Sequence, residues 1–319
     1  MTTANSPDAC AKHPPLALIA GPTASGKSLC AVDLALALQS AGRGAVVINA
    51  DSAQVYRDLA VLSARPNESE MRGIEHRLFG TWDGAAACSA ADWAQAARGE
   101  VAAAQAAGAV PILVGGTGLY IRTLLDGIAP VPAIDPEVRA GVRGLPVEEA
   151  YRALASEDPD RAAALASAYA ARIARALEVV RSTGRTLAEW QKQRSGGIGD
   201  TVSLHPLILL PPRDALYQRC DRRFAAILDG GAIGEVEALL ARHLDPSLPV
   251  MCAIGVAEIA GLLRGDFSQA EALRRGAQAT RNYAKRQYTW LRHQPPGDWP
   301  RLETFYVDMD NHFEYLLQS

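Results

Sequence analysis

Short apolar runs separated by amphipathic stretches dominate the first third of the chain. Leu16–Ala20, Ala45–Asn49 and Val110–Val114 are strand-sized and carry no charge, as expected of strands buried on both faces. Between them, Leu29–Gln39 and Asp92–Ala107 place apolar residues at helical spacing. Strands that alternate with helices predict an α/β fold, with a parallel sheet flanked by helices.

The middle of the chain has a different pattern. Several prolines follow residue 129, and alanine- and arginine-rich helical segments then run to about residue 193. We therefore predict a small helical insertion domain at residues 130–198, set into a core of residues 1–129 and 199–319. Within that core, residues 202–210 resume a strand, helices follow, and Thr304–Val307 is a candidate last strand.

Composition and cysteine spacing indicate a cytoplasmic protein. The 319 residues are 49% hydrophobic and 21% charged, which is ordinary for a globular chain. The first fifteen residues show no secretory signal, and no apolar stretch approaches the roughly 20 residues of a membrane span. No two of the five cysteines have C-x-x-C spacing, so we expect reduced thiols rather than a zinc site or a disulfide framework.

Charge is unevenly distributed. The net charge of −3 argues against a nucleic-acid binder. However, Ala272–Gly297 contains six lysines and arginines, Arg281 and Lys285 among them, and no acidic residue. A basic helix with interleaved aromatic residues suits RNA. It equally suits a solvated helix face whose aromatic residues lie in the core.

The strongest local motif lies between the first strand and the first helix. It matches G-x-x-x-x-G-K-[ST] and comprises Gly21, Pro22, Thr23, Ala24, Ser25, Gly26, Lys27 and Ser28. Such a loop wraps backbone N–H groups around a diphosphate, as in nucleotide-binding and ATP-binding proteins. We expect Lys27 to neutralise phosphate oxygens and the Ser28 hydroxyl to reach a Mg²⁺ ion. The alternative is a glycine-rich turn that matches by accident.

Two further loops follow predicted strands. Asp51 comes after the second strand, and Thr117 follows Gly115 and Gly116 after the third. Because the carboxyl ends of parallel strands line one cleft, we expect both residues near the phosphate loop. Asp51 could hold Mg²⁺ through water, accept a proton, or cap a helix. Thr117 offers a hydroxyl but also fits a structural turn.

Nine segments, taken in order, make the chain resemble the tRNA dimethylallyltransferase family of the bacterial type. They are GPTASGKS (21–28), DSAQVY (51–56), HRL (76–78), SAADW (89–93), LVGGTGLY (113–120), DPEVR (135–139), RALEV (175–179), TGRTL (183–187) and TRNYAKRQYTWLR (280–292). The likeness runs from about Leu16 to Arg292. The chain departs from the family's pattern at Ala166–Tyr169 and at Ile254–Ala257.

The resemblance implies a P-loop NTPase-like fold and a prenyltransferase that acts on tRNA. Such an enzyme transfers a dimethylallyl group from dimethylallyl diphosphate to the N6 amine of the adenosine on the 3′ side of the anticodon, and releases diphosphate. It implies Mg²⁺ as cofactor and tRNA and dimethylallyl diphosphate as partners. We also expect a monomer.

The same resemblance implies roles for particular residues. Asp51 would be the general base, Thr117 a positioning hydroxyl, and Arg223 a partner of Lys27 and Ser28 at the diphosphate. The implied tRNA-contact residues are Asp51, Ser52, Ala53, Gln54, Ala171, Arg172, Ile173, Ala174 and Arg175. Arg281 and Lys285 join them from the basic segment.

Three alternatives stay open at this point. A small-molecule P-loop kinase would use ATP at the same loop, and the arginine-rich insertion could serve as its lid. An isopentenyltransferase could act on free adenine nucleotides, although the basic C-terminal segment favours a large RNA. An RNA-binding protein with a degenerate P-loop fits worst, because Lys27, Ser28 and Asp51 are all present.

Overall fold

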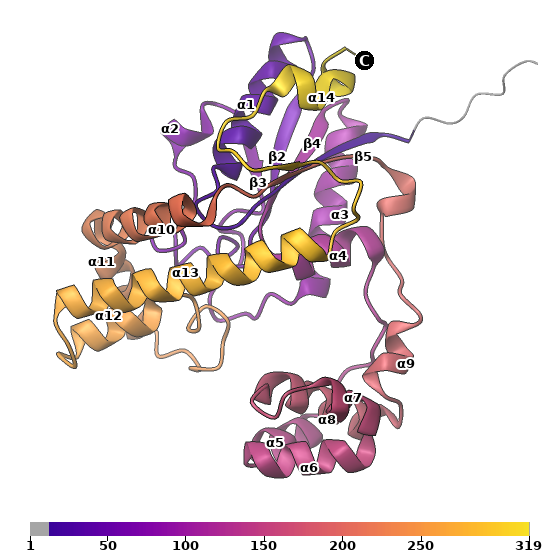
Figure 1. Ribbon diagram of the computed structural model, residues 1–319, viewed down its shortest axis with the longest axis vertical. Helices are drawn as coiled ribbons and strands as arrows, with labels where there is room; N and C mark the ends of the chain where they lie inside the picture. The colour runs from indigo at the N-terminus through magenta and orange to yellow at the C-terminus, as the bar shows by residue number, and fades with distance from the viewer. Residues whose placement is uncertain (1–12, 319) are drawn as a thin grey trace, which may run out of the picture. The chain divides into compact units, whose positions relative to one another are not determined.

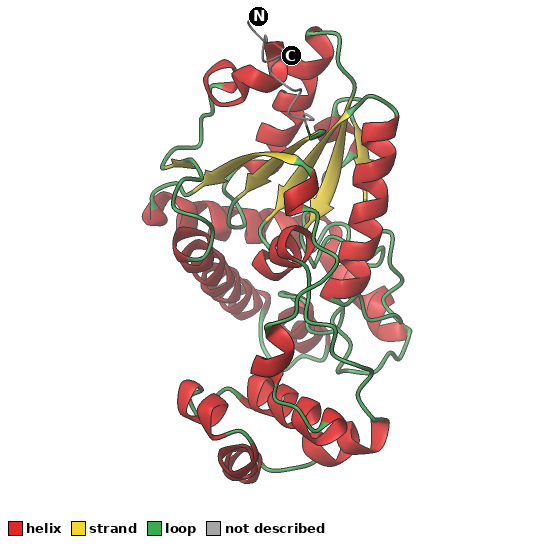
Figure 2. Ribbon diagram, turned by 90° about the vertical axis from the view of Figure 1, so that its right-hand side faces the viewer, coloured by secondary structure: helices red, strands yellow, loops and turns green. Residues whose placement is uncertain are grey.

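The computed structural model describes residues 13–318, which form a six-stranded parallel sheet with helices on both sides (Figures 1 and 2). The strand order is β3-β2-β4-β1-β5-β6. The strands are β1 (Pro15–Ala20), β2 (Ala45–Ala50), β3 (Glu75–Arg77), β4 (Val110–Gly115), β5 (Ser203–Leu209) and β6 (Arg301–Leu302). The predicted α/β class is confirmed.

Strand register brings three loops to one edge of the sheet. Gly115 at the end of β4 is level with Ala20 of β1 and with Ala50 of β2. A side chain at Gly115 would overlap the backbone of Ala50, so only glycine fits there. The loops after β1, β2 and β4 therefore start side by side.

Helices flank the sheet and its loops in the sheet-containing part of the chain. They are α1 (Lys27–Ser40), α2 (Glu68–Met71), α3 (Ala90–Ala106), α4 (Gly118–Asp126), α10 (Arg213–Ile227), α11 (Ile233–Ala241), α12 (Val256–Leu263), α13 (Gln269–His293) and α14 (Met309–Gln318). A π-helical turn, Leu228–Ala232, joins α10 to α11. On one face of the sheet, Leu34 and Leu38 of α1 share a core with Phe313 and Leu316 of α14.

The C-terminal end of the sheet differs from its prediction. Thr304–Val307 is not a strand, and the last strand is the short β6, which pairs with Ile208 and Leu209 of β5. Residues 304–307 have no regular structure. Their apolar character is explained by Val307, whose side chain lies in the core. β3 was not predicted because Glu75–Arg77 contains no apolar residue.

Residues 125–197 form a second compact unit, and the remaining described residues form the first. The second unit is helical and contains α5 (Pro136–Arg143), α6 (Val147–Glu157), α7 (Pro159–Ala164), α8 (Ala170–Thr183) and α9 (Leu187–Gln191). Leu154, Ile173 and Leu177 lie in its own small core. A backbone bridge between Ile128 and Ser195 ties its two ends together.

Two chemical expectations can be compared with the described residues. No helix among them is long and apolar enough to cross a membrane. Cys30, Cys88, Cys220 and Cys252 are all free thiols, the first three of them buried. Cys10 lies outside the described residues.

Candidate active site

The phosphate loop has the backbone shape that its motif predicts. Ala24 and Gly26 adopt left-handed conformations, with φ of 63° and 91°. The turn leads into α1, which begins at Lys27. No side chain caps the N-terminus of this helix. The N–H groups of this first turn can therefore serve an anion.

Two cationic side chains meet at this loop. Lys27 is buried, and its Nζ donates to the Pro22 carbonyl at 3.4 Å. Burial lowers the pKa of Lys27 to about 8, against the opposing attraction of Asp51. Burial likewise lowers the pKa of Arg223, whose guanidinium donates to the Ala64 carbonyl at 3.1 Å. Two desolvated cations of this kind suit a multiply charged anionic ligand.

Asp51 lies at the start of a series of turns. Its Oδ1 accepts the N–H of Ala53 at 3.1 Å, and the turn is fixed by Asn49, whose Oδ1 accepts the N–H of Asp51 at 2.8 Å. Residues 52–62 contain no helix, so the helix-cap explanation of Asp51 is wrong. The carboxylate is 7% exposed and lines a cavity, where its other oxygen can meet a ligand.

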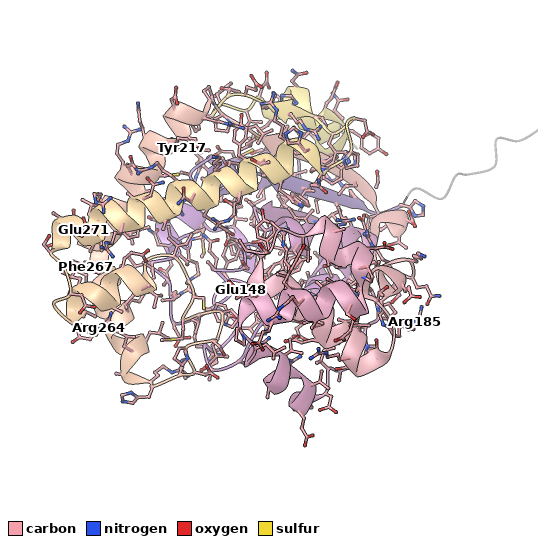
Figure 3. All side chains as sticks on the ribbon, turned by 60° about the horizontal axis from the view of Figure 1, so that its bottom comes forward. Glu148, Arg185, Tyr217, Arg264, Phe267 and Glu271 are labelled. Atoms are coloured by element: carbon pink, nitrogen blue, oxygen red, sulfur yellow. The ribbon has the colours of Figure 1, made fainter. Side chains whose placement is uncertain are left out.

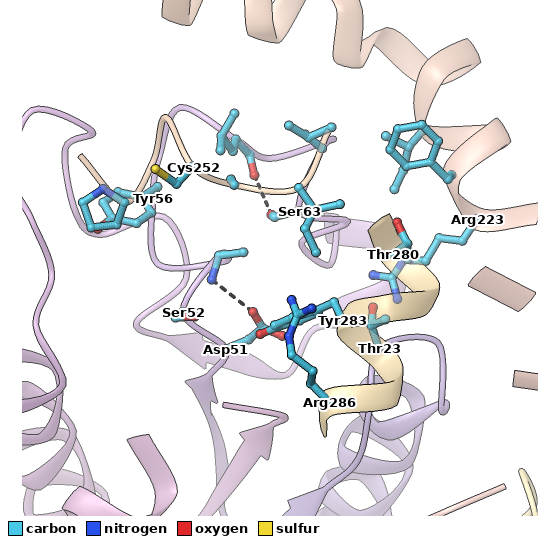
Figure 4. Close-up of a pocket in the computed structure, with 18 of the residues that line it drawn as sticks. Thr23, Asp51, Ser52, Tyr56, Ser63, Arg223, Cys252, Thr280, Tyr283 and Arg286 are labelled. Carbon is cyan, nitrogen blue, oxygen red and sulfur yellow. Dashed lines mark hydrogen bonds between the residues drawn. The ribbon is translucent and has the colours of Figure 1, made fainter. Parts of the chain in front are cut away.

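Thr117 and Tyr283 surround Asp51 with hydroxyl groups. Thr117 Oγ1 accepts the N–H of Ser52 at 3.0 Å and donates to Ser52 Oγ at 3.2 Å. Burial, and to a lesser extent the charge of Asp51, raises the pKa of Tyr283 to about 12, against the opposing effect of hydrogen bonds with Thr117 and Ser52. The phenol therefore stays protonated. Figure 4 shows Tyr283 beside Asp51.

One cavity of about 270 Å³ contains these groups. Its polar wall is formed by Thr23, Asp51, Ser52, Arg223, Thr280, Tyr283 and Arg286, and its apolar wall by Leu59, Leu62, Phe224 and Ile227 (Figure 4). A carboxylate that can accept a proton, a guanidinium and several apolar side chains thus line the same cavity. A reaction between a polar nucleophile and an apolar group would require such a combination.

A larger cavity of about 1130 Å³ lies on the other side of Arg223, which lines both. Its lining residues include the phosphate loop from Ala24 to Ser28 together with Arg65, Arg72, Arg219 and Arg222. So many cations around a P-loop focus a positive potential on one place. This cavity therefore suits a multiply charged anion.

Helix α13 forms one side of the site, but with a face that the charge pattern did not predict. Thr280, Tyr283 and Gln287, spaced as one helical face, point inward, and Gln287 Oε1 accepts the N–H of Thr23 at 2.8 Å. Tyr288 is core, with its hydroxyl on the Leu210 carbonyl. Thr280 and Gln287 were not expected at the site, because the run of positive charge drew attention to the solvent face. Tyr288 fits the alternative that aromatic residues of this segment lie in the core.

The expected tRNA-contact residues have different environments. Ser52 and Ala53 line the cavity, whereas Gln54 is buried and its amide donates to the carbonyls of Ser63 and Ala64 at 3.1 and 3.0 Å. Gln54 therefore supports the loop from inside. Lys285 is exposed.

Of the remaining expected contacts, Arg281 is paired with Asp221 and with Gln278. In the second unit, Ala171 and Arg172 are exposed and Ala174 and Arg175 are half-buried. Ile173 is buried in that unit's core, so its side chain supports the helix rather than forming part of its surface.

The residues at the phosphate loop are compatible with Mg²⁺. No cluster of three or more histidine, cysteine or acidic side chains that could hold a metal occurs in the described part of the chain. Mg²⁺ bound with a diphosphate needs only one or two protein oxygens, since phosphate and water complete its shell. Ser28, whose hydroxyl lines the cationic cavity, provides such an oxygen.

Comparison with known proteins gives one consistent family. The model of the IPP transferase family matches residues 54–294. A tRNA dimethylallyltransferase of Erythrobacter litoralis is 65% identical over 98% of this chain and 99% of its own. Another, of Novosphingobium aromaticivorans, is 70% identical over 82% of this chain and 93% of its own.

Solved structures agree with the sequence relatives. A full-length tRNA isopentenylpyrophosphate transferase from Bacillus halodurans has a TM-score of 0.66 at 30% identity, covering 95% of this chain and 94% of its own. A eukaryotic dimethylallyltransferase acting on tRNA has a TM-score of 0.76 at 25% identity, covering 95% of this chain and 77% of its own. The chain thus belongs to the IPP transferase family, that of the tRNA dimethylallyltransferases.

Proposed function

We propose that this protein transfers a dimethylallyl group from dimethylallyl diphosphate to the N6 amine of the adenosine on the 3′ side of the anticodon in tRNA. The observation that carries the proposal is the shared cavity of Asp51 and Arg223, with the phosphate loop beside it. The cavity thus contains a proton acceptor, a cation for the leaving diphosphate and apolar side chains for the prenyl group.

The reaction assigns a task to each group. The target base must leave its stack to enter the cavity. Its N6 nitrogen attacks C1 of the dimethylallyl group, the C1–O bond breaks, and the N6 proton passes to Asp51. Removing that proton as the bond forms prevents a positive charge from remaining on nitrogen. The hydroxyl groups of Thr117 and Tyr283 position the amine relative to the carboxylate of Asp51.

The leaving group accounts for the cations. Negative charge grows on the diphosphate as the C1–O bond lengthens, so Lys27, Arg223 and the amides of the phosphate loop stabilise the transition state more than the bound substrate. Mg²⁺, bound through Ser28, would add charge neutralisation at the same oxygens. We also propose that the enzyme is cytoplasmic, since its described cysteines are free thiols, and that it acts as a monomer.

Contact with tRNA is proposed for both units. In the second unit, Arg139, Arg143 and Arg175 gather around the buried carboxylate of Glu178, at 4.0, 2.9 and 3.8 Å. Three cations on one anion leave excess positive charge on a half-exposed surface, which suits RNA phosphates. In the first unit, Lys285 and Arg286 offer cations next to the cavity.

The experiment that tests the proposal is label transfer from radioactive dimethylallyl diphosphate to unmodified tRNA, with free AMP and ATP as competing acceptors. We expect label in tRNA alone, and no ATP hydrolysis without RNA. Label in AMP would instead support a free-nucleotide enzyme, and ATP consumption a kinase. The names of the relatives do not favour either alternative.

A further inference from the structure

The apolar end of the active-site cavity is closed by one aromatic ring. Phe224 of α10 is 2% exposed and lines the cavity together with Leu59, Leu62 and Ile227. It directly follows Arg223 in the sequence. Helix α10 therefore sets the cation for the diphosphate and the ring at the apolar end in a fixed relation.

Two glycines make room for this ring. A methyl group at Gly276, in the middle of α13, would overlap the ring of Phe224. At Gly255, where φ is +97°, a methyl group would come within 3.2 Å of the same ring and 2.5 Å of a methyl of Leu62. Glycine inside a helix costs about 0.5–1 kcal/mol relative to alanine, so Gly276 is explained by the packing of Phe224.

The position of the diphosphate fixes which way the prenyl group runs. Arg223 and Ile227 line both the cationic cavity and the active-site cavity, so a donor whose diphosphate lies at Arg223 extends its hydrocarbon along Ile227. Phe224 lies between Arg223 and Ile227 on the same helix, and its ring lines the active-site cavity with Ile227. The target base and the hydrocarbon share this one cavity of about 270 Å³, so the size of the side chain at position 224 limits the length of hydrocarbon that fits.

We propose that Phe224, seated on Gly255 and Gly276, limits the donor to a five-carbon allylic diphosphate and excludes the ten-carbon homologue. This inference rests on the proposed prenyl transfer. It makes Phe224 the residue that determines chain length, through direct contact with the end of the prenyl group. Gly276 determines the same property indirectly, by setting the depth of the ring.

The test compares dimethylallyl with geranyl diphosphate as donors to unmodified tRNA, as a ratio of kcat/KM values. Phe224→Leu and Phe224→Ala should shift the ratio toward the geranyl donor by about tenfold or more, since pocket discrimination follows the volume removed. Gly276→Ala should push the ring into the cavity and lower kcat/KM for dimethylallyl diphosphate. Adding Phe224→Leu to Gly276→Ala should restore it, because the two residues are in contact.

A second phenylalanine provides the matched control. Phe267 packs on Gly261 in the same manner, but it belongs to neither cavity (Figure 3). Phe267→Ala should leave the donor ratio unchanged, and thermal unfolding should confirm that each variant is folded. If one of the single Phe224 variants does not fold, the comparison of Gly276→Ala with the Gly276→Ala/Phe224→Leu double variant still tests the role of Phe224.

The outcomes separate the two ideas. No transfer of either prenyl group to tRNA by the unsubstituted enzyme would overturn the proposed function. Transfer with an unchanged donor ratio in folded Phe224 variants, or absence of rescue in the double variant, would overturn the assignment of Phe224 alone.

Discussion

At the residue scale, the site works with charges that the fold has removed from water. Lys27 is the clearest case, because its ammonium has no carboxylate within hydrogen-bond distance in the described chain and its pKa falls to about 8. Binding of a diphosphate reverses the effect of burial by supplying the missing anion. Affinity for the donor should therefore depend on the protonation of this one residue.

The resulting pH dependence has a definite sign. Lys27 is charged below pH 8 and becomes neutral above it, so kcat/KM for dimethylallyl diphosphate should fall as pH rises through about 8. Lys27→Arg should lower the plateau but move this alkaline limb to higher pH, because a guanidinium keeps its charge. An alkaline limb at the same pH in Lys27→Arg would assign the titration to another group.

At the element scale, the loop of residues 59–63 contributes to the walls of both cavities, and the carboxylate of Glu235 binds its backbone. Leu59, Leu62 and Ser63 line the active-site cavity, whereas Ala60 and Val61 line the cationic one. Glu235 of α11 accepts the N–H groups of Ala60, Val61 and Leu62 at 2.6, 2.8 and 2.8 Å. This shared wall is therefore anchored to α11 as well as by the hydrogen bonds of its own turns.

Removing that anchor should loosen the wall. Glu235→Ala leaves three backbone donors without their acceptor, a loss of about 1–3 kcal/mol, and should lower the melting temperature and raise KM for the prenyl donor. Glu237→Ala, an exposed position on the same helix, is the control and should change neither. Unchanged KM in a folded Glu235→Ala enzyme would show that the loop holds its shape without α11.

The elements differ in how far the sequence could predict them. β1, β2, β4 and β5 are buried apolar runs, and the phosphate loop has a fixed motif, so the sheet and the anion site follow from local pattern. Phe224 and Gln287 could not be assigned this way, since their place at the site depends on how α10 and α13 cross the loops. Glycines such as Gly276 carry the signal, but only once the ring that fills the space is known.

At the scale of the whole molecule, net charge is a poor guide to function. The chain carries −3, yet positive charge is gathered at the cationic cavity, along α13 and around Glu178 in the second unit. Local concentration of cations, rather than the sum, decides whether RNA binds. We therefore expect the two units to contribute separately to tRNA affinity.

Glu178 offers a way to test the second unit without touching the active site. Glu178→Gln removes the buried charge that draws Arg139, Arg143 and Arg175 together. The arginines should then spread apart, raising KM for tRNA severalfold while KM for dimethylallyl diphosphate stays unchanged. Glu148→Gln, at an exposed position of α6 (Figure 3), is the matched control. A rise in both KM values for Glu178→Gln would point to general unfolding instead.

The most direct test of the central claim is single-turnover transfer of labelled dimethylallyl to unmodified tRNA, with every enzyme saturated by both substrates. Asp51→Asn keeps the shape of the turn and an oxygen for the N–H of Ala53, but it cannot take a proton. The account predicts a transfer rate lower by about 10²- to 10⁴-fold, with tRNA and donor affinities close to those of the unsubstituted enzyme. A near-normal rate in Asp51→Asn would contradict it, because the cavity would then hold the substrates without supplying the base.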